Sequence, residues 1–347
     1  MSDSLLLIRA DANAVIGVGH MMRCLGLAQH WQAEGGRVTF ILAQPNPILE
    51  KRLLLDKFEV RVLNTSPGEL EDAQQTAQCV RETGAKILLV DGYHFKQNWF
   101  TVVRKEKVKI GLWTDYCQDL FLPVDLILNQ NPHAQAAELQ AMAPGAQVLA
   151  GLDYLVLRKE FLNRPELRHS RTQGVKKILI TLGGGDSAND SGKILEALKL
   201  IPYSLPQISL VVGHNNPRFE ELTSTAKDLP TVTLERAKDD FAAYSQQFDL
   251  AISAAGATLW ELGYLGLPSL AYIVAENQVP LAQSIQTLGM GVNMGWNHDF
   301  KNHLFTQTLQ SFLSDPLRLE AMSKKALKTI DGKGGVRVTA ALQNLIN

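Results

Sequence analysis

The sequence predicts an α/β protein of two tandem domains, each an open, Rossmann-like sheet of parallel strands covered by helices. Three observations support this. The chain has 347 residues, and a domain usually has about 100–200. Short apolar runs alternate with longer mixed segments, as in β–α–β units. A polar, basic stretch at residues 158–177 interrupts the alternation, which then restarts. We therefore expect domains at residues 1–160 and 176–347, joined by a linker at 161–175.

Short apolar runs predict the strands of the first half. They lie at residues 5–8, 38–42, 60–63, 87–90, 108–112 and 126–128. A helix is expected from residue 21 to about residue 34, since Met21, Leu25 and Ala28 would share one face. Two consecutive glycines follow and end it.

The second half repeats this pattern. Strands are expected at residues 177–182, 208–212, 231–234, 250–253 and 268–274. Helices are expected at residues 191–200 and 259–266, and one or two more at 316–346, broken by glycines at 332–335. Ligands of such sheets bind at the carboxyl ends of the strands, so we expect the two domains to face each other across a cleft.

The composition argues against several classes of protein. The 34 basic and 35 acidic residues leave a formal net charge of −1, which does not favour nucleic-acid binding. The three cysteines lie far apart without a CxxC pair, so neither a zinc site nor a disulfide framework is expected. We expect no signal peptide and no membrane span. The expectation is a cytoplasmic monomer that acts on a small molecule without a metal or cofactor.

The first candidate site is the loop between the first strand and the first helix. Gly17 and Gly19 let the backbone turn close to a ligand, and His20 falls in the first helical turn. There the helix dipole disfavours imidazolium, so we expect a neutral ring that can take a proton from water. The alternative is that His20 only caps the helix. Arg9 and Asp11 flank this loop and are expected to hold it as an ion pair or to contact the substrate.

A dinucleotide fingerprint does not fit this loop. The pattern GxGxxG would need a third glycine where the chain has Met22, and the loop is too long for that motif. A nicotinamide-dependent dehydrogenase is therefore disfavoured.

The second candidate site follows the first strand of the second half. In the run TLGGGD, Gly184 and Gly185 precede Asp186, and such glycines expose N–H groups to a phosphate. It is not a P-loop, because no GK[ST] follows. An ordinary turn between strand and helix explains the glycines equally well.

The third candidate site is at residues 249–261, where a strand ends and a helix begins. Small side chains there let a diphosphate approach the helix N-terminus, and a glutamate can bond ribose hydroxyls. The residues expected to bind the nucleotide are Ser253, Ala255, Gly256 and Glu261. Farther on, Asn277 and Gln278 follow another strand, and Asn277 either binds the substrate or caps the next helix.

Two further strand ends of the first half carry polar groups. Tyr93 can donate its hydroxyl to a substrate, and Asp115 can accept from a sugar hydroxyl, although each fits an ordinary loop equally well. His94 and His133 lack partners at metal-binding spacing, so no metal is expected.

Seven segments resemble those of a known enzyme family. They occur in one order over residues 5 to about 280 and read IRADANAVIGVGHMMRCLGLA, ILLVDGY, LILNQN, GLDYLVLRKEF, LGGGD, AISAAGATLWELGYLGLP and AENQ. The chain resembles the UDP-sugar hydrolases of pseudaminic acid biosynthesis, which remove UDP from UDP-2,4-diacetamido-2,4,6-trideoxy-β-L-altropyranose. Its second half is also similar to glycosyltransferases of the GT-B fold.

The resemblance implies a GT-B architecture with UDP held mainly by the second domain. It implies hydrolysis at the anomeric carbon, with C–O cleavage, inversion and no metal. His20 matches the family's catalytic histidine and Tyr93 its tyrosine after the DxY strand end. The residues that match its nucleotide-binding segments are Gly184, Gly185, Asp186, Ser253, Ala255, Gly256, Glu261, Asn277 and Gln278.

Two other functions remain open on the sequence. A GT-B glycosyltransferase would transfer the amino sugar from UDP to an alcohol instead of water. A nucleotide-sugar sensor would bind the same ligand without turnover. Release of free sugar and UDP without an acceptor distinguishes hydrolysis from both.

Overall fold

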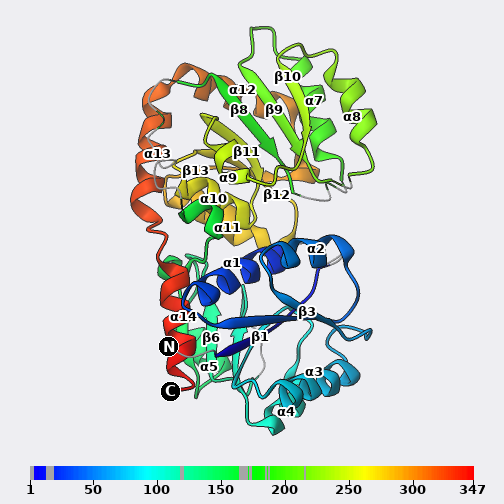
Figure 1. Cartoon of the computed structure of the whole chain (residues 1–347). Coiled ribbons are helices and arrows are strands. Elements are labelled where there is room, and N and C mark those ends of the chain that lie inside the picture. The colour runs from blue at the N-terminus through cyan, green and yellow to red at the C-terminus, as the bar shows by residue number, and fades with distance from the viewer. Residues whose placement is uncertain are drawn as a thin grey trace. The chain divides into compact units, whose positions relative to one another are not determined.

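The computed structural model of the chain describes residues 4–12, 19–117, 121–163, 171, 174–183, 186, 188–214 and 216–347. The chain forms two compact units. Unit 1 consists of Met1–Lys159 and Gly332–Asn347, and unit 2 of Glu160–Asp331. Each contains one parallel sheet with helices packed on it, so the predicted pair of Rossmann-like domains is confirmed (Figure 1).

Unit 1 contains a seven-stranded parallel sheet in the order β3-β2-β1-β4-β5-β6-β7. Its strands are β1 Leu5–Ala10, β2 Arg37–Leu42, β3 Glu59–Val62, β4 Ile87–Asp91, β5 Lys109–Trp113, β6 Leu126–Asn129 and β7 Gln147–Ala150. Its helices are α1 Gly19–Ala33, α2 Pro47–Leu55, α3 Leu70–Thr83, α4 Gln97–Val103, α5 Ala136–Met142 and α14 Gly334–Asn344. Because β1, β4, β5 and β6 are neighbours, their carboxyl ends share one edge of the sheet.

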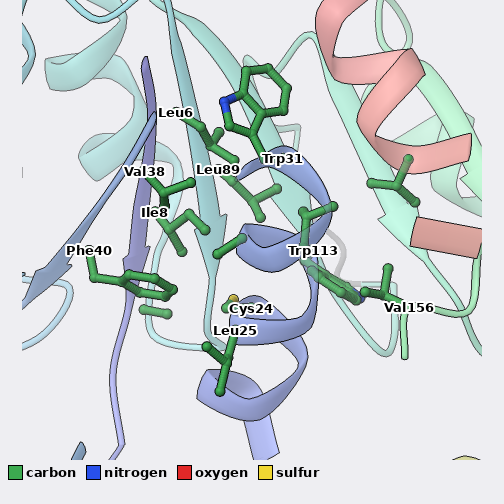
Figure 2. Close-up of a cluster of buried hydrophobic side chains, with 14 of the residues drawn as sticks. Leu6, Ile8, Cys24, Leu25, Trp31, Val38, Phe40, Leu89, Trp113 and Val156 are labelled. Carbon is green, nitrogen blue, oxygen red and sulfur yellow. The ribbon is translucent and has the colours of Figure 1, made fainter. Parts of the chain in front are cut away.

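The apolar runs of unit 1 become strands because helices cover both faces of the sheet. Leu6, Leu7 and Ile8 of β1 are fully buried, and they divide between the cores on the two faces. Figure 2 shows one of these cores, in which Cys24 and Leu25 of α1 lie among strand residues. This packing fixes α1, and with it the histidine in its first turn.

The last helix is a correction to the predicted domain boundaries. We expected residues 176–347 to form the second domain, but α14 packs in unit 1, where Val338 and Leu342 join the core around α1. The predicted glycine break is needed for this packing. A Cβ on Gly334 would lie 2.1 Å from the carbonyl oxygen of Leu155, closer than real atoms approach. Only glycine therefore fits there.

The boundary between the units also differs from the predicted linker at 161–175. It falls after Lys159, inside the short helix α6 Lys159–Leu162. The backbone N–H of Arg171 donates to Ser323 Oγ at 3.0 Å, so this part of the expected linker packs within unit 2. Most of the remainder lies outside the described residues.

Unit 2 contains a six-stranded parallel sheet in the order β10-β9-β8-β11-β12-β13. Its strands are β8 Lys177–Thr181, β9 Gln207–Val212, β10 Val232–Arg236, β11 Leu250–Ala254, β12 Ser269–Ile273 and β13 Gly291–Trp296. Its helices are α7 Asp190–Lys199, α8 Phe219–Ala226, α9 Phe241–Ser245, α10 Ala257–Tyr264, α11 Val279–Thr287, α12 Asn302–Ser314 and α13 Pro316–Thr329.

The strand predictions are confirmed to within a few residues, except at one edge of each sheet. The sequence analysis missed β7 and β13. An edge strand has one neighbour and is buried less, so it needs fewer apolar residues and gives a weaker pattern.

Candidate active site

The carboxyl ends of β1, β4, β5 and β6 hold a buried cluster of polar side chains around His20. The ring is 6% exposed, and its Nδ1 lies 2.6 Å from Asp91 Oδ1 at the end of β4. An ionised carboxylate only accepts, so in the neutral ring Nδ1 carries the proton and Nε2 the lone pair. Among the described residues none hydrogen-bonds to Nε2. Asp91 thus selects one tautomer of the neutral His20 ring, with its lone pair on Nε2.

Arg23 lies one turn after His20 on α1 and binds Asp91 with two hydrogen bonds. Its Nε donates to Oδ2 at 2.7 Å and its Nη2 to Oδ1 at 2.6 Å. The thiol of Cys24 also approaches Oδ2, at 3.3 Å. Burial by itself raises the pKa of Asp91, but Arg23 and His20 together hold it well below its usual range. Asp91 therefore stays ionised at neutral pH.

A second carboxylate completes the cluster. Asp115, after β5, accepts from Arg23 Nη1 at 2.6 Å, from Asn131 Nδ2 at 2.8 Å and from the Tyr93 hydroxyl. Burial alone raises the pKa of Asp115, but Arg23 and His20 lower it overall. The Tyr93 ring lies edge-on to His20 with centroids 4.7 Å apart. The predicted residues Tyr93 and Asp115 thus bind each other, beside the histidine.

Three members of this cluster were missed by the sequence analysis: Asp91, Arg23 and Asn131. The signals were present. Asp91 ends a strand predicted from its apolar run, and Arg23 follows His20 by three residues, which places both on one helix face. The strand order was needed to bring them together, because it makes β4 the neighbour of β1.

Arg9 and Asp11 form a separate network, which supports their interpretation as an ion pair that holds the loop. The Arg9 side chain is fully buried, so it has no exposed surface for a substrate. Its guanidinium binds Asp72 at 2.9 and 2.8 Å, and Nη1 lies 2.7 Å from Asp11. Burial raises the pKa of Asp11, but His94 and Arg9 lower it overall. The structure therefore corrects the expectation that Arg9 contacts the substrate.

We expect Asp72→Ala to destabilise unit 1 by about 3–5 kcal/mol, because it leaves the buried guanidinium of Arg9 without its bidentate partner. Urea unfolding measures the loss. Glu82→Ala is the control, since the Arg61–Glu82 pair is exposed and such pairs contribute about 0–1 kcal/mol. Equal losses in the two variants would contradict the structural role of Asp72.

In unit 2 Asp186 caps a helix. Its Oδ1 accepts from the backbone N–H of Asp190 at 2.7 Å, and its Oδ2 from that of Ser191 at 3.2 Å. Burial raises the pKa of Asp186, and the nearby charge of Asp190 adds to this rise. We expected Asp186 to contact the nucleotide. The structure corrects this, because the carboxylate already accepts hydrogen bonds from the first two amides of α7.

In the turn before α10, three of the residues expected to bind the nucleotide use their hydrogen-bond donors within the protein. Ser253 is buried and its hydroxyl donates to the carbonyl oxygen of Ala254 at 3.0 Å. The N–H of Ala255 donates to Tyr272 O and that of Gly256 to Ala254 O, both at 2.8 Å. Within the described residues, the amides that begin α10 are the donors left for an anion, those of Ala257 and Thr258.

Three more of the predicted residues lie on α10 or just before α11. Glu261 lies on α10 and is 7% exposed. Asn277 lies in a short 3-10 turn, and the N-cap position of α11 is occupied by Gln278, so the alternative that Asn277 caps that helix is wrong. Gln278 Oε1 accepts from the N–H of Val274 at 3.0 Å. A Cβ on Gly256 would lie 3.7 Å from Gln278 Nε2, which places Gln278 beside the turn.

The last predictions to compare with the structure concern four glycines, a metal site and a membrane-spanning helix. Gly17, Gly184 and Gly185 lie outside the described residues, whereas Gly19 begins α1 and is exposed. In the described part of the chain, no group of three or more His, Cys, Asp or Glu side chains is arranged to hold a metal ion. No helix described in the structure is both long and apolar enough to cross a membrane.

No family model matches the chain. Two curated proteins are similar to it along much of its length. It is 25% identical to the spore coat polysaccharide biosynthesis protein SpsG of Bacillus subtilis, with 97% of each chain covered. It is 26% identical to the UDP-2,4-diacetamido-2,4,6-trideoxy-beta-L-altropyranose hydrolase of Campylobacter jejuni, over 64% of this chain and 74% of the other.

Solved structures share the fold at low sequence identity. MurG of Acinetobacter baumannii has a TM-score of 0.69 at 15% identity, covering 99% of this chain and 100% of the other. A UDP-GlcNAc 2-epimerase of Neisseria meningitidis, solved with UDP-GlcNAc, has a TM-score of 0.64 at 14% identity, covering 98% and 100%. These similarities confirm the fold expected from the sequence, two parallel-sheet domains of the GT-B kind.

Proposed function

We propose that the protein is a nucleotide-sugar hydrolase that releases UDP from a UDP-linked 2,4-diacetamido-2,4,6-trideoxy sugar, a step of pseudaminic acid biosynthesis. The observation that carries the proposal is the short bond between His20 and Asp91, which leaves Nε2 as a base at the ligand-binding edge of the sheet. The similarity to a hydrolase of this specificity and to a polysaccharide biosynthesis protein supports the substrate class.

In the proposed reaction His20 Nε2 accepts a proton from a water molecule while the water oxygen attacks C1 of the sugar. The bond from C1 to the β-phosphate oxygen breaks, its electron pair leaves with UDP, and the configuration at C1 inverts. Asp91 holds the ring in position and balances the imidazolium that forms. Holding the water in line with C1 contributes to the rate in addition to the proton transfer.

Unit 2 supplies the nucleotide-binding groups in this proposal. The first amides of α10, at Ala257 and Thr258, would meet the negative charge that develops on the leaving diphosphate. Glu261 would accept from the ribose hydroxyls, and Asn277 with Gln278 would contact the substrate. The small residue Gly256 keeps the approach to these amides open.

We expect Gly256→Ala to weaken UDP binding by about tenfold or more, because the methyl group occupies the approach to the amides of α10. The protein itself has room for it, since the nearest atom would be 3.7 Å away. Isothermal titration calorimetry with UDP measures the affinity. Gly145→Ala is the control, because a Cβ there meets nothing within 4 Å. Unchanged UDP affinity in Gly256→Ala would contradict the assigned nucleotide site.

The main alternative is a GT-B glycosyltransferase, which needs an acceptor alcohol. The test is incubation with a panel of UDP-linked amino sugars in the absence of any acceptor, following UDP and the sugar anomer first formed. Hydrolysis predicts stoichiometric free sugar and UDP. Turnover only after an alcohol is added would identify a transferase.

A further inference from the structure

Arg23 makes an unusual set of contacts for a residue with no place in the bond-breaking step. It binds both carboxylates of the cluster, Asp91 at 2.7 and 2.6 Å and Asp115 at 2.6 Å. Its Nη2 is also 3.1 Å from His20 Nδ1. The guanidinium lies over the ring of Trp113, 5.0 Å from its centroid, and the side chain is 6% exposed. Water therefore screens these charges weakly.

The charges of the cluster explain why this cation matters to a base. With a neutral His20 the two carboxylates and one guanidinium sum to −1, and taking up a proton from water brings the sum to zero. Without Arg23 two buried anions would face the ring, and they would hold its proton much more strongly. A histidine that keeps its proton at neutral pH cannot accept one from water.

We propose that Arg23 is a positioning residue that sets the proton affinity of His20 by sharing its charge between Asp91 and Asp115. The consequence for catalysis rests on the proposed function, but the effect of Arg23 on the His20 ring does not depend on any reaction. In the described part of the chain, the ionisable groups that face His20 are Asp91 from β4, Tyr93 from the loop after β4, Asp115 from the loop after β5, and Arg23 from α1, while Cys24 of α1 contacts Asp91.

The chain offers a matched control for this claim. Arg9 is also a buried arginine clamped by a bidentate aspartate, Asp72, and paired with a second, Asp11. Arg9 contacts that separate network and not His20, so its replacement by lysine tests what losing a buried guanidinium does to stability alone.

The test compares Arg23→Met, Arg23→Lys and Arg9→Lys. NMR titration of the His20 ring nitrogens in the full chain gives a readout that needs no substrate. We expect the titration midpoint of His20 to rise by about 1–3 pH units in Arg23→Met, because an adjacent cation is lost. In Arg23→Lys, which keeps the charge, it should move much less, and in Arg9→Lys it should not move.

The pH profile of kcat/KM gives the second readout. The acidic limb should move to higher pH in Arg23→Met, so that activity is lost far more at pH 6 than at pH 9. A midpoint that stays or falls in both Arg23 variants would overturn the inference, as would a profile lowered equally at every pH. If no hydrolysis is found in the unaltered protein, the proposed function fails, and the NMR titration still decides the role of Arg23.

Discussion

Replacement of His20 by alanine is expected to lower kcat by about 10²–10⁴-fold, the range that a positioned general base contributes. The affinity for UDP should stay nearly unchanged, since the groups proposed to bind it belong to unit 2. The measurements are release of UDP from the UDP-sugar and calorimetric binding of UDP to the variant. Added imidazole should restore part of the lost rate, because the substitution leaves a space beside Asp91 at the end of β4.

His20→Gln is the companion variant. It fills a similar volume and can still hydrogen-bond to Asp91, but its amide is not a base. It should therefore lose as much activity as His20→Ala and gain nothing from imidazole. Full turnover in either variant would remove His20 from the reaction.

The second large effect is expected for Asp91→Asn, a loss of about 10²–10⁴-fold in kcat. The amide is nearly the same size as the carboxylate, but its NH₂ must face either His20 or Arg23. Facing His20, it donates to Nδ1 and moves the ring proton to Nε2, where the base is needed. If the NH₂ faces Arg23, two hydrogen-bond donors oppose each other, and the hydrogen bonds between residue 91 and Arg23 weaken.

Asp115→Asn provides the comparison for Asp91→Asn. Asp115 shares Arg23 with Asp91 but makes no hydrogen bond to the ring. Asp115→Asn should therefore lose clearly less activity than Asp91→Asn. Thermal unfolding of both variants separates lost activity from lost fold. An Asp91→Asn protein that is folded and turns over normally would contradict the role given to this carboxylate.

The local pattern of the sequence predicts much of this fold. Apolar runs predicted most strands, and Gly35 with Gly36 correctly predicted the end of α1. The glycines near residue 334 marked a true break. What they could not indicate is that α14 returns to unit 1, because a helix with an apolar face can pack in either unit. That choice depends on long-range contacts such as those of Val338 and Leu342.

The candidate site, too, could be predicted only where it depends on local sequence. His20 could be singled out because its position in a helical first turn is a local property. Its partner could not, because a hydrogen bond between residues 20 and 91 exists only once β4 lies beside β1. Likewise, nothing local distinguishes an aspartate that binds a nucleotide from one that caps a helix, and Asp186 caps α7. Parallel strand order is the information that sequence pattern lacks.

The most direct test of the central claim is hydrolysis of UDP-2,4-diacetamido-2,4,6-trideoxy-β-L-altropyranose in ¹⁸O-labelled water, without an acceptor, followed by mass spectrometry of both products. The account predicts label in the sugar released first and none in UDP, because water activated by His20 attacks C1. Label in the β-phosphate of UDP, or no turnover until an alcohol is supplied, would contradict it.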